Sequence, residues 1–256
     1  MIDWDPLVYL RAADERARPF HDLVARIGAE HPRAVVDLGC GPGTLTAVLA
    51  HRWPGAAVRA MDSSPEMVAA ARAAGVDAEF GDVTGWRPGP DDDVVVCNAV
   101  LQWVPGHLDL VRRWVAGLAP GAWFAFQVPG NFTARSHVLI RELAAGPQWT
   151  DRLAGHLRDE HAVHSPAEYA IAIAATGCAV DAWETTYLHR LTGPDPVLEW
   201  VTGTALRPVR TALDDTEWAA FTADLAPLLR AAYPPADDGT TWFPFRRIFA
   251  VAHNPT

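Results

Sequence analysis

The sequence predicts an α/β protein built on a doubly wound, mostly parallel sheet of seven strands. Three observations predict this fold class. Short apolar, β-branched runs alternate with helical patterns along the first half of the chain. A glycine-rich turn joins the first run to the helix that follows it. The 256 residues are 50% hydrophobic and 20% charged, a composition that excludes a disordered chain.

The first half of the chain carries the clearest alternation of strands and helices. Strands are expected over 34–38, 57–61, 76–80, 93–97 and 123–128, with helices over 44–53, from about residue 63 to Gly75, and over 107–118. Ser63 and Glu66 have the spacing of a capping box, Pro65 suits a first helical turn, and Gly75 suits a position just after a helix. This half therefore predicts a parallel sheet with helices on both faces.

The second half is less regular. A helix over 166–176 leads into a strand over 179–188, and a long amphipathic helix over 216–233 precedes a last strand over 242–252. One side of the long helix carries the apolar residues Trp218, Phe221, Leu225, Leu228 and Leu229. We expect one domain over 1–256, with 131–165 and 190–240 as lid-like helical insertions.

Charge excludes some classes of partner. The chain has 31 acidic and 21 basic residues, all of them arginine, so the formal net charge is −10. A negative field repels nucleic acids and anionic membranes, so we expect neither as a partner. A small anionic substrate remains compatible where arginines gather locally, and we expect a monomer.

The cysteines and the N-terminus indicate a cytoplasmic protein. Cys40, Cys97 and Cys178 are odd in number, widely spaced and set among apolar neighbours, as expected of reduced cysteines that pack as small hydrophobic residues. The first residues include acids and no apolar signal segment, and no apolar run reaches the length of a membrane span.

The sharpest local pattern is the turn after the first strand, VVDLGCGPG, with Gly39, Gly41 and Gly43. Glycines in such a turn let a ligand approach the bare backbone. A G-x-G pattern alone is weak, because any tight turn between a strand and a helix favours glycine. Here the spacing is G-x-G-x-G rather than the dinucleotide pattern G-x-G-x-x-G.

Three acids strengthen the interpretation of this turn as a ligand site. Asp62 follows the second strand, where a carboxylate can accept hydrogen bonds from a ribose diol. Asp82, in Gly81-Asp82-Val83, ends the third strand at the same edge and can accept from an exocyclic amine. Asp37 lies inside an apolar strand and needs a partner, which a cationic or amine-bearing ligand could supply.

These residues resemble the class I S-adenosylmethionine-dependent methyltransferases, whose fold is Rossmann-like. The resemblance implies that the glycine turn contacts the methionine and ribose portions of S-adenosylmethionine, that Asp62 binds the ribose hydroxyls and that Gly81-Asp82 lies at the adenine. It places Asn98 near the methionine amino group. The implied cofactor-binding residues are Asp37, Gly39, Gly41, Asp62, Ser63, Asp82, Val83 and Asn98.

A closer resemblance covers almost the whole chain. The blocks that carry it are Trp4-x-Pro6-x-x-Tyr9-Leu10, Arg16-x-Arg18-Pro19, Asp62-Ser63-Ser64-Pro65-x-Met67, Asn98-Ala99-x-Leu101-Gln102-Trp103-Val104, Leu206-Arg207-Pro208 and Phe245-Arg246-Arg247-x-Phe249. Together they resemble the trans-aconitate 2-methyltransferase family. The resemblance implies methyl transfer to one carboxylate of trans-aconitate, or of a related polycarboxylic acid, to give a monomethyl ester and S-adenosylhomocysteine.

This chemistry needs positioning rather than acid or base catalysis. A carboxylic acid has a pKa of about 4, so the acceptor is already ionised at neutral pH. Arginine holds a carboxylate bidentately and stays charged. We expect the substrate-binding residues to be Tyr9, Arg18, Trp103, Arg207 and Arg247, with Arg16 and Arg246 as alternatives. Each arginine could equally be a solvated or ion-paired surface residue, and Trp103 could simply be core.

Other functions remain open from the sequence. One alternative is a methyltransferase for an oxygen, nitrogen or carbon atom of another metabolite; hydroxyl and carbon acceptors usually need a base, for which His21, His107 and His137 are candidates. A nicotinamide-dependent oxidoreductase is disfavoured by the glycine spacing, and a binding module without catalysis is not excluded. His156, His161 and His164 match no standard ligand spacing, so no metal is expected.

Overall fold

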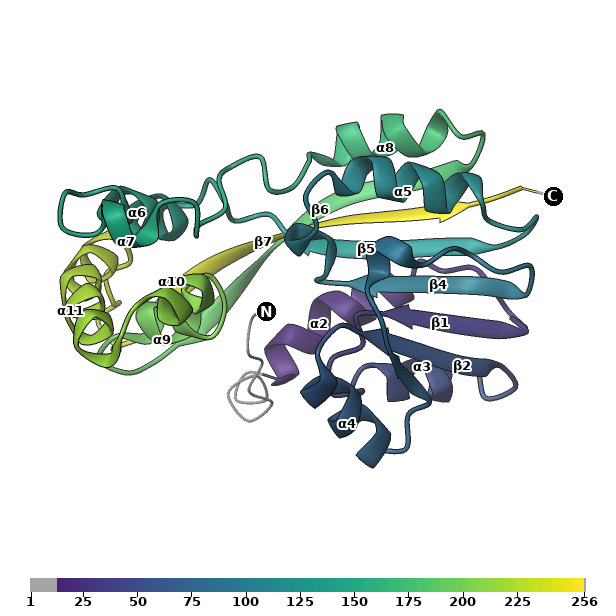
Figure 1. Cartoon of the computed structure of the whole chain (residues 1–256), viewed down its shortest axis with the longest axis horizontal. Helices are drawn as coiled ribbons and strands as arrows, with labels where there is room; N and C mark the ends of the chain where they lie inside the picture. The colour runs from purple at the N-terminus through teal and green to yellow at the C-terminus, as the bar shows by residue number, and fades with distance from the viewer. Residues whose placement is uncertain (1–12, 256) are drawn as a thin grey trace. The chain divides into compact units, whose positions relative to one another are not determined.

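The computed structural model describes residues 13–255, with side chains from Ala17 onwards (Figure 1). Its helices are α2 (Ala13–Val24), α3 (Thr46–Arg52), α4 (Pro65–Ala73), α5 (His107–Ala116), α6 (Arg135–Ala144), α7 (Thr150–Leu153), α8 (Pro166–Ala174), α9 (Pro196–Thr202), α10 (Arg207–Ala212) and α11 (Asp215–Ala232), with 3-10 turns η1 (Val83–Gly85) and η2 (Leu101–Trp103). Its strands are β1 (Ala34–Leu38), β2 (Ala57–Asp62), β3 (Ala78–Phe80), β4 (Asp92–Asn98), β5 (Trp123–Pro129), β6 (Ala179–Leu191) and β7 (Thr241–His253).

The seven strands form one sheet in the order β3-β2-β1-β4-β5-β7-β6. The first five pair in parallel, and β7 runs antiparallel to β5. The predicted mostly parallel, seven-stranded α/β fold with flanking helices is therefore confirmed. The strand order reverses between β1 and β4, so the loops that follow these two strands run in opposite directions along the sheet. In open α/β sheets, ligands bind in the crevice between such loops, at the carboxyl ends of the strands.

The chain divides into two compact units. The sheet unit comprises the described residues up to Pro129 together with Val163–Thr185 and 247–255; the helical unit comprises Gly130–Ala162 and Thr186–Arg246. In the sheet unit, β1 is buried along its whole length, and all of Val94, Val95 and Val96 in β4 are fully buried, as expected for central parallel strands.

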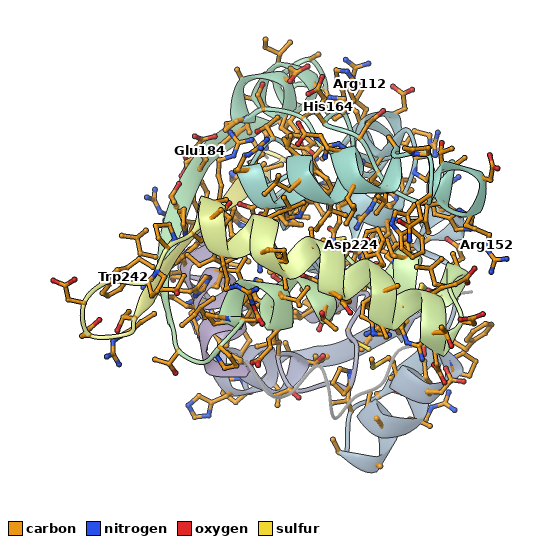
Figure 2. All side chains as sticks on the ribbon, turned by 90° about the vertical axis from the view of Figure 1, so that its left-hand side faces the viewer. Arg112, Arg152, His164, Glu184, Asp224 and Trp242 are labelled. Carbon is orange, nitrogen blue, oxygen red and sulfur yellow. The ribbon has the colours of Figure 1, made fainter. Side chains whose placement is uncertain are left out.

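The helical unit holds α6, α7, α9, α10 and α11. The long helix α11 buries Phe221, Leu225 and Leu229 and packs against α6 and α9 (Figure 2). Leu228, expected on the same side, is 40% exposed, because the buried stripe follows every fourth residue and leaves position 228 at its margin. The backbone N–H of Ser136 donates to the Tyr233 hydroxyl at 3.0 Å and so ties the start of α6 to the residue that ends α11.

Two local details correct the sequence-based expectations. The residue that caps α4 is Ser64 rather than Ser63: its side chain accepts from the Met67 backbone N–H. Gly75 does follow the helix with φ +84°, and the Val76 backbone N–H donates to the Ala71 carbonyl at 3.0 Å. Because this hydrogen bond makes Val76 part of the end of the helix, β3 begins at Ala78, two residues later than expected.

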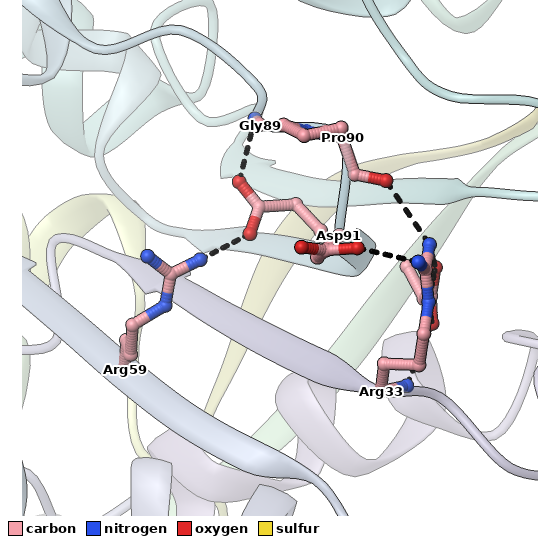
Figure 3. A network of polar contacts seen from close by, with 7 residues as sticks. Arg33, Arg59, Gly89, Pro90 and Asp91 are labelled. Atoms are coloured by element: carbon pink, nitrogen blue, oxygen red, sulfur yellow. Dashed lines mark hydrogen bonds and ion pairs between the residues drawn. The ribbon is translucent and has the colours of Figure 1, made fainter.

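A network of arginines and aspartates joins the amino ends of β1 and β4 (Figure 3). Arg33 pairs with Asp91 and Asp93, and Asp92, only 3% exposed, accepts hydrogen bonds from Arg59 and from the Gly89 backbone N–H. This network lies at the opposite end of these strands from the glycine turn. It is therefore suited to hold the sheet rather than a ligand.

Replacing Asp92 by alanine should destabilise the protein by about 2 kcal/mol, because the half-buried Gly89 N–H and the charged Arg59 each lose their acceptor. Urea unfolding measures the change. The Asp91→Ala variant is the control: Asp91 is 70% exposed, so its loss should cost less than about 1 kcal/mol. Equal effects of the two substitutions would contradict this account.

Candidate functional site

The glycine turn between β1 and α3 has the backbone form that glycine permits. Gly39, Gly41 and Gly43 have φ values of +77°, +57° and +82°. A Cβ on Gly39 would come within 2.1 Å of a Val100 methyl group, so this position tolerates no side chain. A Cβ on Gly41 would meet nothing within 4 Å. The turn is thus closely packed at Gly39 and open at Gly41, as a ligand cradle requires.

Asp62 holds this turn in place from the end of β2. One carboxylate oxygen accepts from the Gly41 backbone N–H at 2.8 Å, and the other accepts from the Ser64 backbone N–H at 2.9 Å. Each oxygen keeps a second lone pair with which it can accept a ligand hydroxyl. Ser63 lies between these contacts and is exposed.

Asp37 is buried beneath the turn, with 2% of its surface exposed. The Thr46 hydroxyl donates to its carboxylate at 2.6 Å. The pKa of Asp37 is raised to about 6, mainly by burial; the Thr46 hydrogen bond opposes this rise, and the nearby charge of Asp62 adds to it. A cation placed beside Asp37 would favour its ionised form.

Asp82 and Val83 lie next to Asp62, because the Gly81 backbone N–H donates to the Asp62 carbonyl at 3.0 Å. One Asp82 oxygen accepts from both the backbone N–H and the hydroxyl of Thr84 at 2.8 Å, which lowers the pKa of Asp82. Val83 begins η1 and is buried. The carboxylate is therefore ionised at neutral pH, and its other oxygen can accept from an amine.

A chain of polar side chains crosses three neighbouring strands. Gln127 on β5 donates to the Asn98 side-chain oxygen on β4 at 2.7 Å and accepts from Arg247 on β7 at 3.5 Å. Arg247 is only 9% exposed. Ala99, next to Asn98, has φ +56°, a strained conformation for a residue with a side chain. These hydrogen bonds thus join Asn98, an expected cofactor residue, to Arg247, an expected substrate residue.

The other expected substrate residues are placed separately. Tyr9 lies outside the described residues. Arg18 is exposed on α2, and Trp103 ends η2, half-buried, in the same sheet unit. Arg207 begins α10 in the helical unit, where Arg246 donates to the Gly130 carbonyl at 2.8 Å.

The histidines considered as bases differ in their surroundings. His107 is buried between α5 and α8, with one ring nitrogen 2.6 Å from the Tyr169 hydroxyl, and burial lowers its pKa to about 4. His137 lies in the helical unit, and burial also lowers its pKa to about 4. His21 is exposed on α2. His107 therefore serves to join two helices.

Residues 13–255 contain neither a cluster of metal ligands nor a membrane-spanning helix. No three His, Cys, Asp or Glu side chains in this range gather as ligands for a metal ion. No helix in it has the length and apolar character needed to cross a membrane. The three cysteines are buried free thiols.

Sequence reasoning missed Thr46, the strained Ala99 and the link made by Arg247 to Gln127. These features depend on residues that meet only through the sheet, such as Gln127, which pairs with Asn98 in the β4–β5 register. No local pattern in the sequence signals them.

Comparison with known proteins agrees with this geometry. Residues 9–182 match a family model described as a methyltransferase domain. The chain is 59% identical over 250 residues to trans-aconitate 2-methyltransferases of Mycobacterium sp. (strain KMS) and Rhodococcus jostii (strain RHA1), covering 97% of this chain and 98% of each relative.

Solved structures show a similar fold at low sequence identity. Geranyl diphosphate C-methyltransferase from Streptomyces coelicolor, in complex with S-adenosyl-L-homocysteine, is 15% identical with a TM-score of 0.53, over 96% of this chain and 82% of that one. Haemonchus contortus phosphoethanolamine N-methyltransferase 2, in complex with S-adenosyl-L-methionine, is 17% identical with a TM-score of 0.53, over 93% of this chain and 53% of that one.

These structural similarities concern the fold alone, whereas the sequence identity extends over nearly the whole chain, insertions included. The chain belongs to the trans-aconitate 2-methyltransferase family, within the S-adenosylmethionine-dependent methyltransferases of the class I fold.

Proposed function

We propose that this protein transfers the methyl group of S-adenosylmethionine to one carboxylate of trans-aconitate, giving a monomethyl ester and S-adenosylhomocysteine. Relatives at 57–59% identity are named for this reaction. In this chain, the observation that carries the proposal is the Asp62 carboxylate, held by Gly41 and Ser64 beside the open face of the glycine turn.

The proposed cofactor contacts follow from the chemistry of each group. Asp62 accepts from the ribose hydroxyls, while Asp82 and the Val83 backbone contact the adenine edge. Asp37 and Asn98 bind at the methionine end, where a positive charge would stabilise ionised Asp37. The open space at Gly41 lets the nucleoside approach the backbone.

The reaction needs no general base from this chain. The acceptor carboxylate is ionised at neutral pH. One of its oxygen lone pairs forms the new O–C bond while the C–S bond breaks, and that electron pair stays on sulfur. The side chains contribute by holding the acceptor in line and excluding water, and such positioning can supply about 7–11 kcal/mol.

We propose Arg247 as the main arginine that holds the substrate. It is buried and contacts Gln127, which in turn contacts Asn98 at the methionine end of the proposed cofactor site. A buried guanidinium binds a carboxylate more strongly than an exposed one. Arg18, Trp103, Arg207 and Tyr9 remain proposed contacts.

Methyl transfer can be measured directly with radioactive S-adenosylmethionine. We expect label to enter trans-aconitate as an ester that base hydrolyses, and one equivalent of S-adenosylhomocysteine to form. Transfer to an oxygen, nitrogen or carbon of another metabolite, with no turnover of any tricarboxylic acid, would favour the alternative acceptor instead.

Cofactor affinity should depend on pH through Asp37. Below pH about 6 this carboxyl is protonated in the free protein, so binding a cation must first expel the proton. We therefore expect the affinity for S-adenosylhomocysteine, whose amino group is also cationic, to fall by up to tenfold per pH unit below about 6. Calorimetry from pH 5 to 8 measures this dependence.

The Asp37→Asn variant is the control for this pH dependence. This variant should bind S-adenosylhomocysteine weakly at every pH, and its affinity should not change with pH between 5 and 8. It should also be more stable than the parent at pH 7 without ligand, by about 2–3 kcal/mol, because a raised carboxyl pKa makes folding less favourable as pH rises through about 4 to 6. A parent affinity that is flat across this range would refute the contact with Asp37.

We further propose that the enzyme is a cytoplasmic monomer without a metal, and that 131–165 and 190–240 act as lid-like insertions in one methyltransferase domain. The buried free cysteines support the cytoplasmic compartment, because reducing compartments keep thiols free. Slower proteolysis of these segments when S-adenosylhomocysteine and trans-aconitate are bound would support the lids, and unchanged cleavage would contradict them.

A further inference from the structure

The side chain of His107 connects three segments of the sheet unit. His107 is the first residue of α5 and is only 3% exposed. Helices α5 and α8 lie side by side (Figure 1). The Nε2 atom of His107 is 2.6 Å from the hydroxyl of Tyr169 on α8, and its Nδ1 atom is 3.1 Å from the Val104 carbonyl oxygen, in the segment before α5. Both ring nitrogens therefore have a buried partner, although no step of the proposed reaction uses this histidine.

These partners select one protonation state of the ring. A carbonyl oxygen only accepts, so Nδ1 carries the proton and donates it to Val104. Burial lowers the pKa of His107 to about 4 against the opposing effect of the Val104 hydrogen bond, so the ring is neutral at pH 7. Its Nε2 atom then accepts from the Tyr169 hydroxyl, whose oxygen accepts from the His164 backbone N–H at 3.3 Å. The hydrogen bonds thus run in one direction, from His164 to Val104.

Val104 ends a short segment that covers the glycine turn. Residues 99–104 leave the end of β4 and form η2, and the Val104 backbone N–H closes this turn with a 3.0 Å hydrogen bond. The Val100 side chain lies against Gly39, since a Cβ there would come within 2.1 Å of its methyl group. Trp103, a proposed substrate contact, immediately precedes Val104. The position of this segment therefore bears directly on the proposed site.

The two ends of the segment are held by different contacts. At its start, Asn98 pairs with Gln127 in the β4–β5 register and accepts from its side chain at 2.7 Å. The Ala99 backbone N–H donates to the Gln127 carbonyl at 2.9 Å. At its end, the Val104 carbonyl accepts from the His107 ring. The start of the segment thus depends on the sheet, and its end depends on His107.

We infer that His107 is a positioning residue for methyl transfer, which fixes the end of η2, and with it Trp103, through the Val104 carbonyl. Tyr169 assists by donating to Nε2, which keeps the ring proton on Nδ1. His107 touches neither donor nor acceptor and moves no proton in the reaction. A displacement of about 1 Å at a group that positions reactants can cost about 100-fold in rate. The part played by Trp103 rests on the proposed function.

Two substitutions separate the Val104 contact from the Tyr169 contact. Asparagine places its amide N–H near the position of Nδ1, so His107→Asn keeps a donor for Val104 and loses the acceptor for Tyr169. Glutamine reaches the position of Nε2, so His107→Gln keeps an acceptor for Tyr169 and loses the donor for Val104. We expect kcat/KM for trans-aconitate to fall by about 10–100-fold in His107→Gln and by less than about fivefold in His107→Asn. The opposite order, expected if His107 only joins α5 to α8, would overturn the inference.

Cofactor affinity separates positioning from a general loss of structure. Calorimetry with S-adenosylhomocysteine should show a change of no more than about threefold in both variants, because Asn98 is held by Gln127 rather than by His107. His31→Gln is the matched control, since His31 is an exposed histidine of the same unit, and it should behave like the parent. A His107→Gln variant that loses as much cofactor affinity as kcat/KM would contradict the positioning role.

The parent protein gives a test that does not depend on the reaction. NMR of the ring nitrogens at neutral pH should show the His107 proton on Nδ1, and a proton on Nε2 would overturn the inference even if no variant folds. Hydrogen exchange of the Val104 amide should be faster in His107→Gln than in His107→Asn, with the fully buried Val95 as reference. If both results hold but trans-aconitate is not methylated, His107 still fixes the segment and the proposed reaction is rejected.

Discussion

Replacing Asp62 by alanine should weaken binding of S-adenosylhomocysteine by at least 100-fold while the protein stays folded. The substitution removes the acceptors of the Gly41 and Ser64 backbone N–H groups, so the glycine turn loses its support. It also removes the proposed acceptors of the ribose hydroxyls. Hydrogen bonds to a charged group contribute about 1.5–3 kcal/mol each, and two of them account for this loss.

Calorimetry with S-adenosylhomocysteine measures this effect, and circular dichroism shows whether the fold is kept. Asp109→Ala is the matched control, because Asp109 is an exposed acid of the same unit on α5. We expect that variant to bind like the parent. An Asp62→Ala variant with parental affinity would mean that the cofactor does not use this edge of β2.

The second large effect is expected at Arg247. The Arg247→Leu variant should lose at least 100-fold in kcat/KM for trans-aconitate, because a buried guanidinium that holds a carboxylate is removed. Affinity for S-adenosylhomocysteine should change by no more than about threefold, because the proposed nucleoside contacts Asp62, Asp82 and Val83 lie at the end of β2 and after β3, and none of them contacts Arg247 through the Gln127–Asn98 hydrogen bond. The Arg247→Lys variant keeps the charge but lacks the planar guanidinium, so its kcat/KM should lie between that of the parent and that of Arg247→Leu.

Methyl-transfer kinetics at varied trans-aconitate concentration measure this loss, and calorimetry verifies that the cofactor site is intact. Arg112→Leu serves as the control, since Arg112 is exposed on α5 and pairs weakly with Asp109 at 3.4 Å. A normal KM in the Arg247→Leu variant would remove this residue from the substrate site.

The sheet and the glycine turn could be predicted because their signals are local. An apolar run stopped by glycines requires only its own residues, and β1 is indeed Ala34–Leu38. The helix expected over 44–53 is shorter, Thr46–Arg52, because Gly43 has a left-handed φ of +82° and the chain turns before the helix begins. The cap of α4 moved from Ser63 to Ser64 for the same kind of reason, since adjacent serines are equivalent until the backbone is known.

The candidate site was predictable only in part. Asp62 and Asp82 each follow a parallel strand, so topology alone places them at one edge. The partner of Asp37 is Thr46, on the following helix, and the partner of Arg247 is Gln127, far away in sequence. Such contacts arise from tertiary packing.

The most direct test is a crystal structure of the protein with S-adenosylhomocysteine and trans-aconitate. The account predicts the nucleoside at the glycine turn, with its ribose hydroxyls on Asp62 and one ionised acid group of trans-aconitate pointing at the sulfur. Electron density for the nucleoside at any other place, with the turn at Gly41 empty, would contradict it.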